Sequence, residues 1–174
     1  NALAGKEAKI VMKLNSLVDP AIIAALYEAS NAGVEIKLII RGVCSLVTGI
    51  KDLSENIEVR SIVGRFLEHS RIFYFYNDGK EDVYLSSADM MQRNLDRRVE
   101  IAFPIENAKL KDEIIKTLLK VTLKDNVKSR ILQPDGSYLF SEVKDSTKKV
   151  NSQEWFMNHA LKATGVRSQK TFHK

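Results

Sequence analysis

The first forty residues alternate between short apolar runs and polar breaks in a pattern typical of an α/β fold. An apolar run at residues 8–13 predicts a buried strand, and Asp19-Pro20 then provides an N-cap and a first-turn proline for a helix, which Gly33 is expected to end. A second strand is expected at residues 35–40, so the chain opens with a strand–helix–strand unit, whose strands normally pair in parallel. The apolar face of the helix repeats at helical spacing: Ile22, Ile23, Leu26 and Tyr27.

The middle of the chain predicts more strands of the same sheet. The turn sequence Asn77-Asp78-Gly79-Lys80 indicates a hairpin between two of them, and Pro104 is expected to stop the last strand of the sheet. The four expected strands are residues 57–63, 72–76, 82–85 and 99–103.

The C-terminal third predicts helices and one small hairpin. A Pro134-Asp135-Gly136 turn favours pairing of residues 131–132 with 138–140. From Ser141 onward the composition shifts to Lys, Ser, Thr and Asn, so we expect a domain at residues 1–140 and a basic extension at 141–174 that contains one short helix, 152–163. An amphipathic helix is expected at 110–123, with its apolar stripe at Leu110, Ile114, Ile115, Leu118 and Leu119.

Composition narrows the class of protein. The 174 residues are 44% hydrophobic, which is enough for a core, and 27 Lys+Arg against 22 Asp+Glu give a net charge of +5, which favours anionic partners. A single cysteine, Cys44, permits no internal disulfide, suits a reducing cytosol and is expected to be a small buried hydrophobe. The sequence shows neither a signal peptide nor an apolar run near the roughly 20 residues that span a bilayer. Because the first residue is Asn1 and not Met, we expect a piece of a longer polypeptide, or one that lacks its original start.

Residues suited to phosphate chemistry gather in two stretches, 66–71 and 84–99. They combine His69, small hydroxyls and several arginines, and Arg41-Gly42 ends a predicted strand at the edge where α/β sheets collect ligands. Arginine offers planar, permanently charged donors, serine hydroxyls donate to phosphoryl oxygens, and histidine moves a proton near neutrality. The alternative is a solvated charged face with a surface histidine.

These stretches resemble two known families. His69-Ser70-Arg71 followed by Ser86-Ser87-Ala88-Asp89 is similar to one half of the phospholipase D signature, His-x-Lys then Gly-Ser-x-Asn, although Arg71 stands in place of lysine and Asp89 in place of asparagine. Several blocks together look like the last catalytic domain of bacterial polyphosphate kinase, the long-chain family with a phosphohistidine intermediate. Those blocks are residues 13–20, 40–44, 64–71, 85–90, 93–100 and 132–136.

The resemblance implies an α/β fold of phospholipase D type: a mixed sheet flanked by helices, with a small C-terminal hairpin and a basic tail. It implies reversible transfer of the terminal phosphate of ATP to polyphosphate, with this chain supplying half of the site and inactive alone. By block matching, His69 corresponds to a functional histidine across the nucleotide phosphates and Arg41 to an arginine that contacts them. We further expect Arg71, Ser87, Arg93 and Arg97 to line a phosphate path.

The same resemblance implies the partners. ATP or ADP, polyphosphate and Mg²⁺ are expected, with the metal ligands outside this chain, together with the polypeptide that precedes Asn1. The full protein is expected to be a homo-oligomer in the cytoplasm, with membrane association as an alternative, and to bind no nucleic acid. Two other functions remain open: a phosphodiesterase or nuclease half-site completed by dimerisation, and a non-catalytic module that binds polyanions.

Other assignments follow from the residues themselves. In an extended segment Arg97 and Arg98 point to opposite sides, so only one can face the site. Asp89 and Glu100 are expected to orient arginines, with magnesium binding as the alternative. No Gly-Lys-Ser/Thr phosphate loop occurs, which excludes a P-loop kinase. Tyr74 and Tyr76 are expected to pack rather than stack on a base, and His159 and His173 to lie on the surface.

Overall fold

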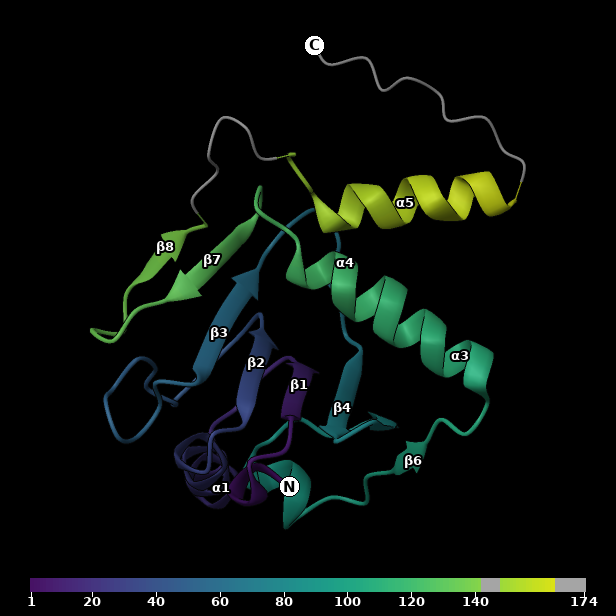
Figure 1. Ribbon diagram of the computed structural model, residues 1–174. Helices are drawn as coiled ribbons and strands as arrows, with labels where there is room; N and C mark the ends of the chain where they lie inside the picture. Colours follow the sequence, from purple (N-terminus) through teal and green to yellow (C-terminus); the bar gives the residue numbers. More distant parts are fainter. Residues whose placement is uncertain (142–147, 165–174) are drawn as a thin grey trace.

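The computed structural model describes residues 1–141 and 148–164, and in them the strands form one mixed sheet (Figure 1). The strand order is β6-β5-β4-β1-β2-β3-β7-β8. The strands are β1 Ala8–Leu14, β2 Glu35–Ile40, β3 Ile57–Ile62, β4 Arg71–Asn77, β5 Lys80–Ser86, β6 Ala102–Pro104, β7 Ser129–Leu132 and β8 Tyr138–Phe140. The helices are η1 Ala2–Ala4, α1 Pro20–Asn31, α2 Gln92–Leu95, α3 Ala108–Glu113, η2 Ile114–Leu119, α4 Lys120–Leu123 and α5 Ser152–Ala163.

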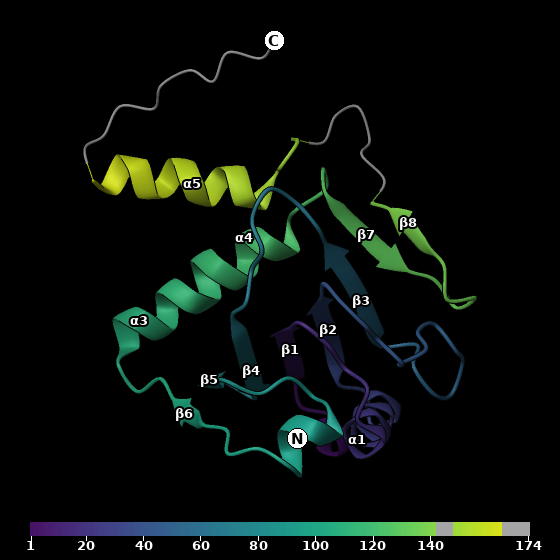
Figure 2. The same cartoon turned by 180° about the vertical axis from the view of Figure 1, so that it is seen from behind.

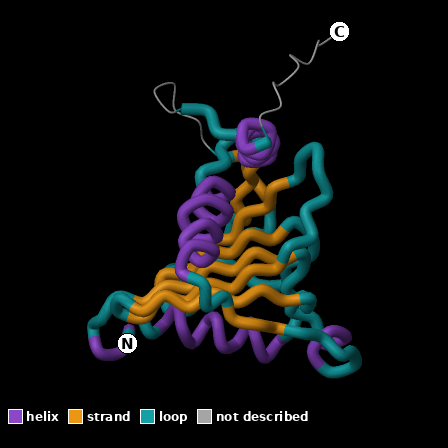
Figure 3. Tube along the Cα trace, turned by 90° about the vertical axis from the view of Figure 1, so that its right-hand side faces the viewer, coloured by secondary structure: helices purple, strands orange, loops and turns teal. Residues whose placement is uncertain are grey.

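The predicted strand–helix–strand opening is confirmed. The Asp19 side chain accepts a hydrogen bond from the backbone N–H of Ile22, 3.0 Å away, and so caps α1, while Gly33 follows the helix with a φ of +90°. β1 pairs in parallel with β2, which pairs in parallel with β3, whereas β4 runs antiparallel on the other side of β1. Figure 3 shows loops gathered along the edge where these parallel strands end, opposite the N-terminus.

Alternating side chains give the sheet two apolar faces. On one face Leu14, Leu38 and Phe73 pack with Leu26 of α1. On the other face Val11, Ile72 and Tyr74 pack with Ile114 and Leu119, so the continuous helix α3–η2–α4 covers that side. Both faces of the central strand β1 are therefore buried, which explains why its sequence is an apolar run rather than an alternating one.

Two sequence predictions are wrong in detail. The strand expected at 99–103 is only Ala102–Pro104, an edge strand, and the sheet continues at its other edge through β7 and β8. The helix expected at 110–123 begins at Ala108, and its middle turn is a π-helix, Ile114–Leu119. Because a π turn holds more residues than an α turn, the expected stripe does not stay on one face. Leu110 and Leu118 are 52% and 37% exposed, while Thr122 is buried.

The C-terminal helix is confirmed as α5, Ser152–Ala163. The domain boundary expected at Ser141 stays a prediction, since residues 142–147 and 165–174 of the expected extension, with His173, lie outside the described residues. Within the described part, no helix is long and apolar enough to cross a membrane.

Candidate functional site

Loops that follow β1, β2 and β5 meet at the carboxyl edge of the parallel strands. Leu17, fully buried, connects them: its N–H donates to the carbonyl of Val43, 2.9 Å away, and the next N–H, of Val18, donates to the carbonyl of Met90 at 2.9 Å. Segments that lie far apart in the sequence are thus joined by backbone hydrogen bonds, which fix the positions of the residues around them.

Gly42 sets how closely two of these loops approach. Its N–H donates to the carbonyl oxygen of Asn15 at 2.8 Å, and a Cβ added to Gly42 would lie 2.7 Å from that same oxygen. Only glycine fits this approach without a shift of the backbone. The contact holds Arg41, the preceding residue, beside the end of β1.

Asn15 and Asp89 connect the two arginines that the sequence singled out. The Asn15 side-chain oxygen accepts from Arg41 Nε at 2.5 Å, and its amide nitrogen faces Asp89 Oδ2 at 3.4 Å. Asp89 Oδ2 also accepts from Arg71 Nη2 at 2.8 Å, while Asp89 Oδ1 accepts from the backbone N–H of Asn15 at 2.7 Å and of Ser16 at 3.2 Å. Arg41 and Arg71 therefore belong to one hydrogen-bonded chain.

This arrangement fixes the charge state of Asp89. Burial of the carboxyl opposes ionisation, but the hydrogen bond from Arg71 and those from the backbone of Asn15 and Ser16 outweigh it, so the pKa of Asp89 lies below its ordinary value. The Arg71 and Asp89 side chains are 11% and 9% exposed, so the pair is largely withdrawn from water. Arg71 and Asp89 stand where the phospholipase D pattern has lysine and asparagine, and the two side chains contact each other.

His69 lies at the exposed end of the same chain of contacts. Arg71 Nη1 donates to His69 Nδ1 at 2.7 Å and to the His69 carbonyl at 3.0 Å. Because a guanidinium has no acceptor, Nδ1 must accept, which places the imidazole proton on Nε2. The structure thus brings together Arg41, Arg71 and His69, three of the residues predicted to contact phosphate, with one imidazole N–H left to donate.

Ser87 and Glu100 form a second cluster. The Ser87 hydroxyl donates to Glu100 and accepts from the N–H of Ile101 at 3.0 Å, and Asn94 Nδ2 donates to Glu100 at 2.6 Å. The hydrogen bonds from Ser87 and Asn94 keep the pKa of Glu100 below its usual range. Asp89 therefore orients an arginine as expected, whereas Glu100 holds a serine and an asparagine instead. Ser87 remains a predicted phosphate ligand, with its hydroxyl proton directed at Glu100 in this structure.

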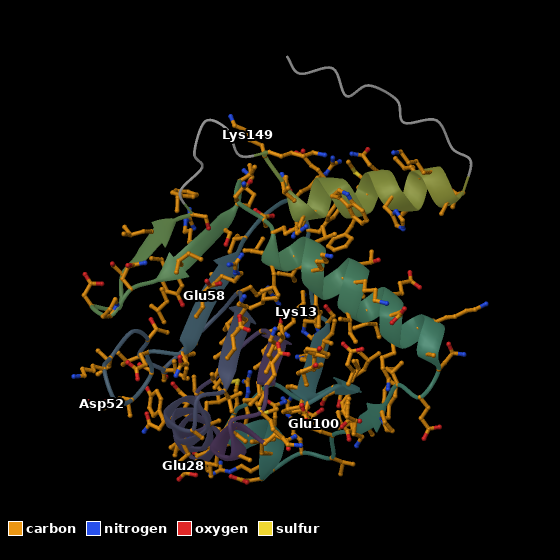
Figure 4. The ribbon with its side chains drawn as sticks, in the orientation of Figure 1. Lys13, Glu28, Asp52, Glu58, Glu100 and Lys149 are labelled. Atoms are coloured by element: carbon orange, nitrogen blue, oxygen red, sulfur yellow. The ribbon has the colours of Figure 1, made fainter. Side chains whose placement is uncertain are left out.

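The remaining predicted phosphate ligands lie in and after the short helix α2. Arg93 and Arg97 are both exposed. Arg98, with Glu100, Asn94 and Leu95, lines a mostly apolar pocket of about 490 Å³ on the α1 face of the sheet. Arg98 rather than Arg97 faces this pocket. Figure 4 shows Glu100 toward the α1 side and Lys13 over the middle of the sheet.

Lys13 is a residue of the site that sequence reasoning did not assign. Its Nζ lies 2.8 Å from Glu68 Oε2 and 2.9 Å from Ser70 Oγ, so it contacts both neighbours of His69, and its side chain is only 9% exposed. A lysine inside the apolar run Ile10–Leu14 was the available signal, because a charge on a buried central strand requires a partner.

The acidic residues do not suit a metal ion. Asp89 is occupied by Arg71 and backbone N–H groups, and Glu100 by Ser87 and Asn94. No group of three or more His, Cys, Asp or Glu side chains in the described residues is arranged to hold a metal.

Other residues considered from the sequence have structural surroundings. Tyr74 is buried and donates to Glu81 at 2.9 Å, and the partly buried Tyr76 packs on the same face. Cys44 packs against the core on the α1 face, where burial raises the pKa of its thiol. His159 is exposed and stacks on Trp155.

Comparisons with known proteins agree on one family. The chain matches the family model described as polyphosphate kinase C-terminal domain 2 over residues 1–153. It is 62% identical over 138 residues to the polyphosphate kinases of Burkholderia ambifaria and Paraburkholderia phytofirmans, covering 79% of this chain but 20% of each relative. The chain therefore spans about one fifth of the length of these curated relatives.

Solved structures give the same family and extend the fold comparison. The crystal structure of polyphosphate kinase from Porphyromonas gingivalis superposes with a TM-score of 0.86 at 41% identity, covering 92% of this chain and 24% of that one. Nuc from Salmonella typhimurium, a phospholipase D family member, superposes with a TM-score of 0.55 at 18% identity over 76% of this chain and 86% of that one, which shows the fold alone. The expected phospholipase D-like mixed sheet is confirmed, and this chain belongs to the polyphosphate kinase C-terminal domain 2 family.

Proposed function

We propose that this chain is half of the active site of a polyphosphate kinase, an enzyme that transfers the terminal phosphate of ATP reversibly to polyphosphate. The observation that carries the proposal is the single chain of contacts that links Arg41, Asn15, Asp89, Arg71 and His69 at the carboxyl edge of the sheet. It supports a preorganised arrangement of donors for a phosphoryl group, and the family membership supports which phosphoryl group that is.

Within the linked chain of contacts, the positive charge available to phosphate comes from Arg41. Its Nε is engaged by the neutral Asn15, so the bond leaves the charge uncompensated and the two terminal nitrogens available to anionic oxygens. Within residues 1–141 and 148–164 Arg41 forms no ion pair, whereas the charge of Arg71 is balanced by Asp89. Arg41 therefore contacts phosphate in this proposal, and Arg71 chiefly orients His69. Arg93 and Arg97 extend the phosphate path along the surface.

His69 acts as a donor toward the phosphoryl group that is transferred. With Nδ1 accepting from Arg71, Nε2 carries the proton and can donate it to an oxygen on which negative charge develops. Phosphoryl transfer spreads charge over the equatorial oxygens, so a fixed N–H and a fixed guanidinium stabilise the transition state more than the ground state.

The rest of the reaction lies with the rest of the polypeptide. The proposal places the histidine that becomes phosphorylated, and the ligands of Mg²⁺, in the part of the enzyme that precedes Asn1. ATP or ADP and polyphosphate are the proposed substrates, and the complete protein is proposed to be a homo-oligomer in the cytoplasm.

The test uses the full-length enzyme with ATP, Mg²⁺ and polyphosphate. His69→Ala should abolish transfer in both directions and leave the melting temperature nearly unchanged, because the imidazole is exposed and contributes little to the core. Wild-type turnover in this variant would remove His69 from the mechanism. The isolated 174-residue chain given labelled ATP should form no stable phosphohistidine, and near-stoichiometric label on His69 would contradict its role as a donor.

A further inference from the structure

His69 lies in a loop whose apolar side chains are exposed and do little to hold the loop in place. Residues 63–70, here called the His69 loop, connect β3 to β4. Val63, Phe66 and Leu67 in this loop are 59%, 48% and 79% exposed, so burial of apolar surface does little to fix the loop. Its conformation must depend on polar contacts with other elements.

Two partly buried ion pairs flank His69. On one side Glu68 contacts Lys13 of β1 at 2.8 Å, and on the other side Arg71 contacts Asp89 at 2.8 Å. The Lys13 ammonium also donates to Ser70 Oγ at 2.9 Å. The loop is therefore fixed to the sheet immediately before and after His69, which leaves the imidazole exposed on a constrained backbone.

The earlier part of the loop is held by Gln153, near the start of α5. Gln153 Oε1 accepts from the N–H of Phe66 at 2.8 Å, while Nε2 donates to the Phe66 carbonyl and to Glu68 Oε1, both at 2.9 Å. Gln153 is 5% exposed, so water competes poorly for these bonds. Figure 2 shows the segment between β3 and β4 passing the start of α5.

The start of α5 is itself firmly anchored. Asp125, which is 1% exposed, accepts from both the N–H and the hydroxyl of Ser152 at 2.7 Å through Oδ2. Its other oxygen, Oδ1, accepts from the N–H groups of Val127, Lys128 and Ser129. Gln153 therefore projects from a firmly held helix start and contacts the His69 loop, which buries little apolar surface.

We propose that Gln153 is a positioning residue for His69, acting through the backbone of Phe66 and the Glu68–Lys13 pair to hold the imidazole where transfer requires it. The proposal rests on the function proposed above. It assigns α5 a part in catalysis at a distance from the phosphate. Since Asn15 and Gly42, which hold Arg41, make no contact with Gln153, loss of Gln153 should disturb the chemical step and leave ATP binding largely intact.

The test compares Gln153→Ala and Gln153→Met in the full-length enzyme, because methionine keeps most of the volume and removes all three hydrogen bonds. We expect kcat to fall between about tenfold and a hundredfold while the KM for ATP changes by less than about threefold, since small misplacements of a catalytic group cost that much. Deuterium exchange at the amides of residues 64–70 should become faster. Gln133→Ala, which removes a glutamine bond to the carbonyl of Ile131 in the β7–β8 hairpin, is the matched control and should leave kcat unchanged.

Gly64 offers an independent perturbation of the same contact. A Cβ at Gly64 would lie 2.5 Å from Gln153 Oε1, so Gly64→Ala should displace the glutamine and lower kcat in the same way. In the Gln153→Ala background that collision no longer exists, and Gly64→Ala should then have no further effect.

Three outcomes would overturn one or other of the two claims. If His69→Ala is inactive while Gln153→Met and Gly64→Ala retain kcat within about twofold of wild type, Gln153 does not position His69. The same conclusion follows if the two single effects simply multiply in the double variant. If His69→Ala itself turns over like wild type, the proposed function of His69 fails, whatever the Gln153 variants do.

Discussion

The Arg71–Asp89 pair gives the most direct prediction about stability. Asp89→Asn keeps the shape of the side chain and an oxygen for the backbone N–H groups of Asn15 and Ser16, but it removes the charge that balances Arg71. The guanidinium is then left in a largely buried site without its counter-charge. Breaking a buried pair from one side costs about 3–5 kcal/mol, far more than the pair contributes on the surface.

The structure places this variant at the low end of that range. The two side chains keep 11% and 9% exposure, and Arg71 retains its bonds to His69, so we expect the free energy of unfolding to fall by about 3 kcal/mol. For a chain of this size that corresponds to a melting temperature lower by about 6–12 °C.

The assay is thermal and urea unfolding of the 174-residue chain across pH. Because the folded-state pKa of Asp89 is lowered, its stabilisation is complete above the ordinary carboxyl pKa of about 3.9 and is lost as the pH falls through the folded-state value. Wild type should therefore lose stability in acid, below about pH 4, and Asp89→Asn should lose this part of the acid dependence. Asp135→Asn, in an exposed turn, is the control and should cost much less. Equal destabilisation by the two variants would refute the reasoning.

Two further predictions concern the loop that follows β2. Arg41→Lys should barely change the melting temperature, since lysine can still donate to Asn15. It should lower ATP turnover of the full-length enzyme by tenfold or more, on the order of 1.4 kcal/mol, because the two-pronged geometry of the guanidinium is lost. A variant that melts much earlier yet retains its activity per folded molecule would contradict the phosphate role of Arg41. Gly42→Ala should lower the free energy of unfolding by about 1–3 kcal/mol, measured by urea denaturation, because its Cβ would lie 2.7 Å from the carbonyl oxygen of Asn15. Wild-type stability of this variant would show that the two loops can move apart without loss of stability.

The parts of the fold that the sequence predicted well are those with local signals. The sequence predicts α1 because Asp19-Pro20 caps and begins a helix locally. It predicts the turn between β4 and β5 because Asn77–Lys80 is itself a turn sequence. The segment 99–103 was misassigned because Val99, Ile101 and Phe103 alternate like a strand. They are instead 100%, 62% and 45% exposed, and pairing with β5 begins only at Ala102. Periodicity carries no information on where a partner strand stops.

The candidate site shows the same division. His69, Arg41 and Arg71 stand in recognisable motifs, whereas Gln153 contacts the His69 loop across 87 residues of sequence with no local mark. The sequence predicted that Asp89 orients an arginine, but it did not indicate that the arginine is Arg71, 18 residues earlier. In the structure these two residues form one ion pair, so Arg71 and Asp89 together stand where the phospholipase D pattern has a lysine and an asparagine.

The contact between Phe66 and Gln153 also determines when, during synthesis, the segment around His69 can reach its folded conformation. At about 5–20 residues per second, the ribosome needs roughly 4–17 s to synthesise the 87 residues that separate them. By then the residues of β1 to β8 have been made, and Lys13 can already meet Glu68. The segment around His69 is thus synthesised early but gains its contacts with Gln153 only after α5 begins to be made. A chain released shortly before residue 153 would carry all eight strands of the described sheet with the segment around His69 still loosely held, so we expect proteases to cleave there first.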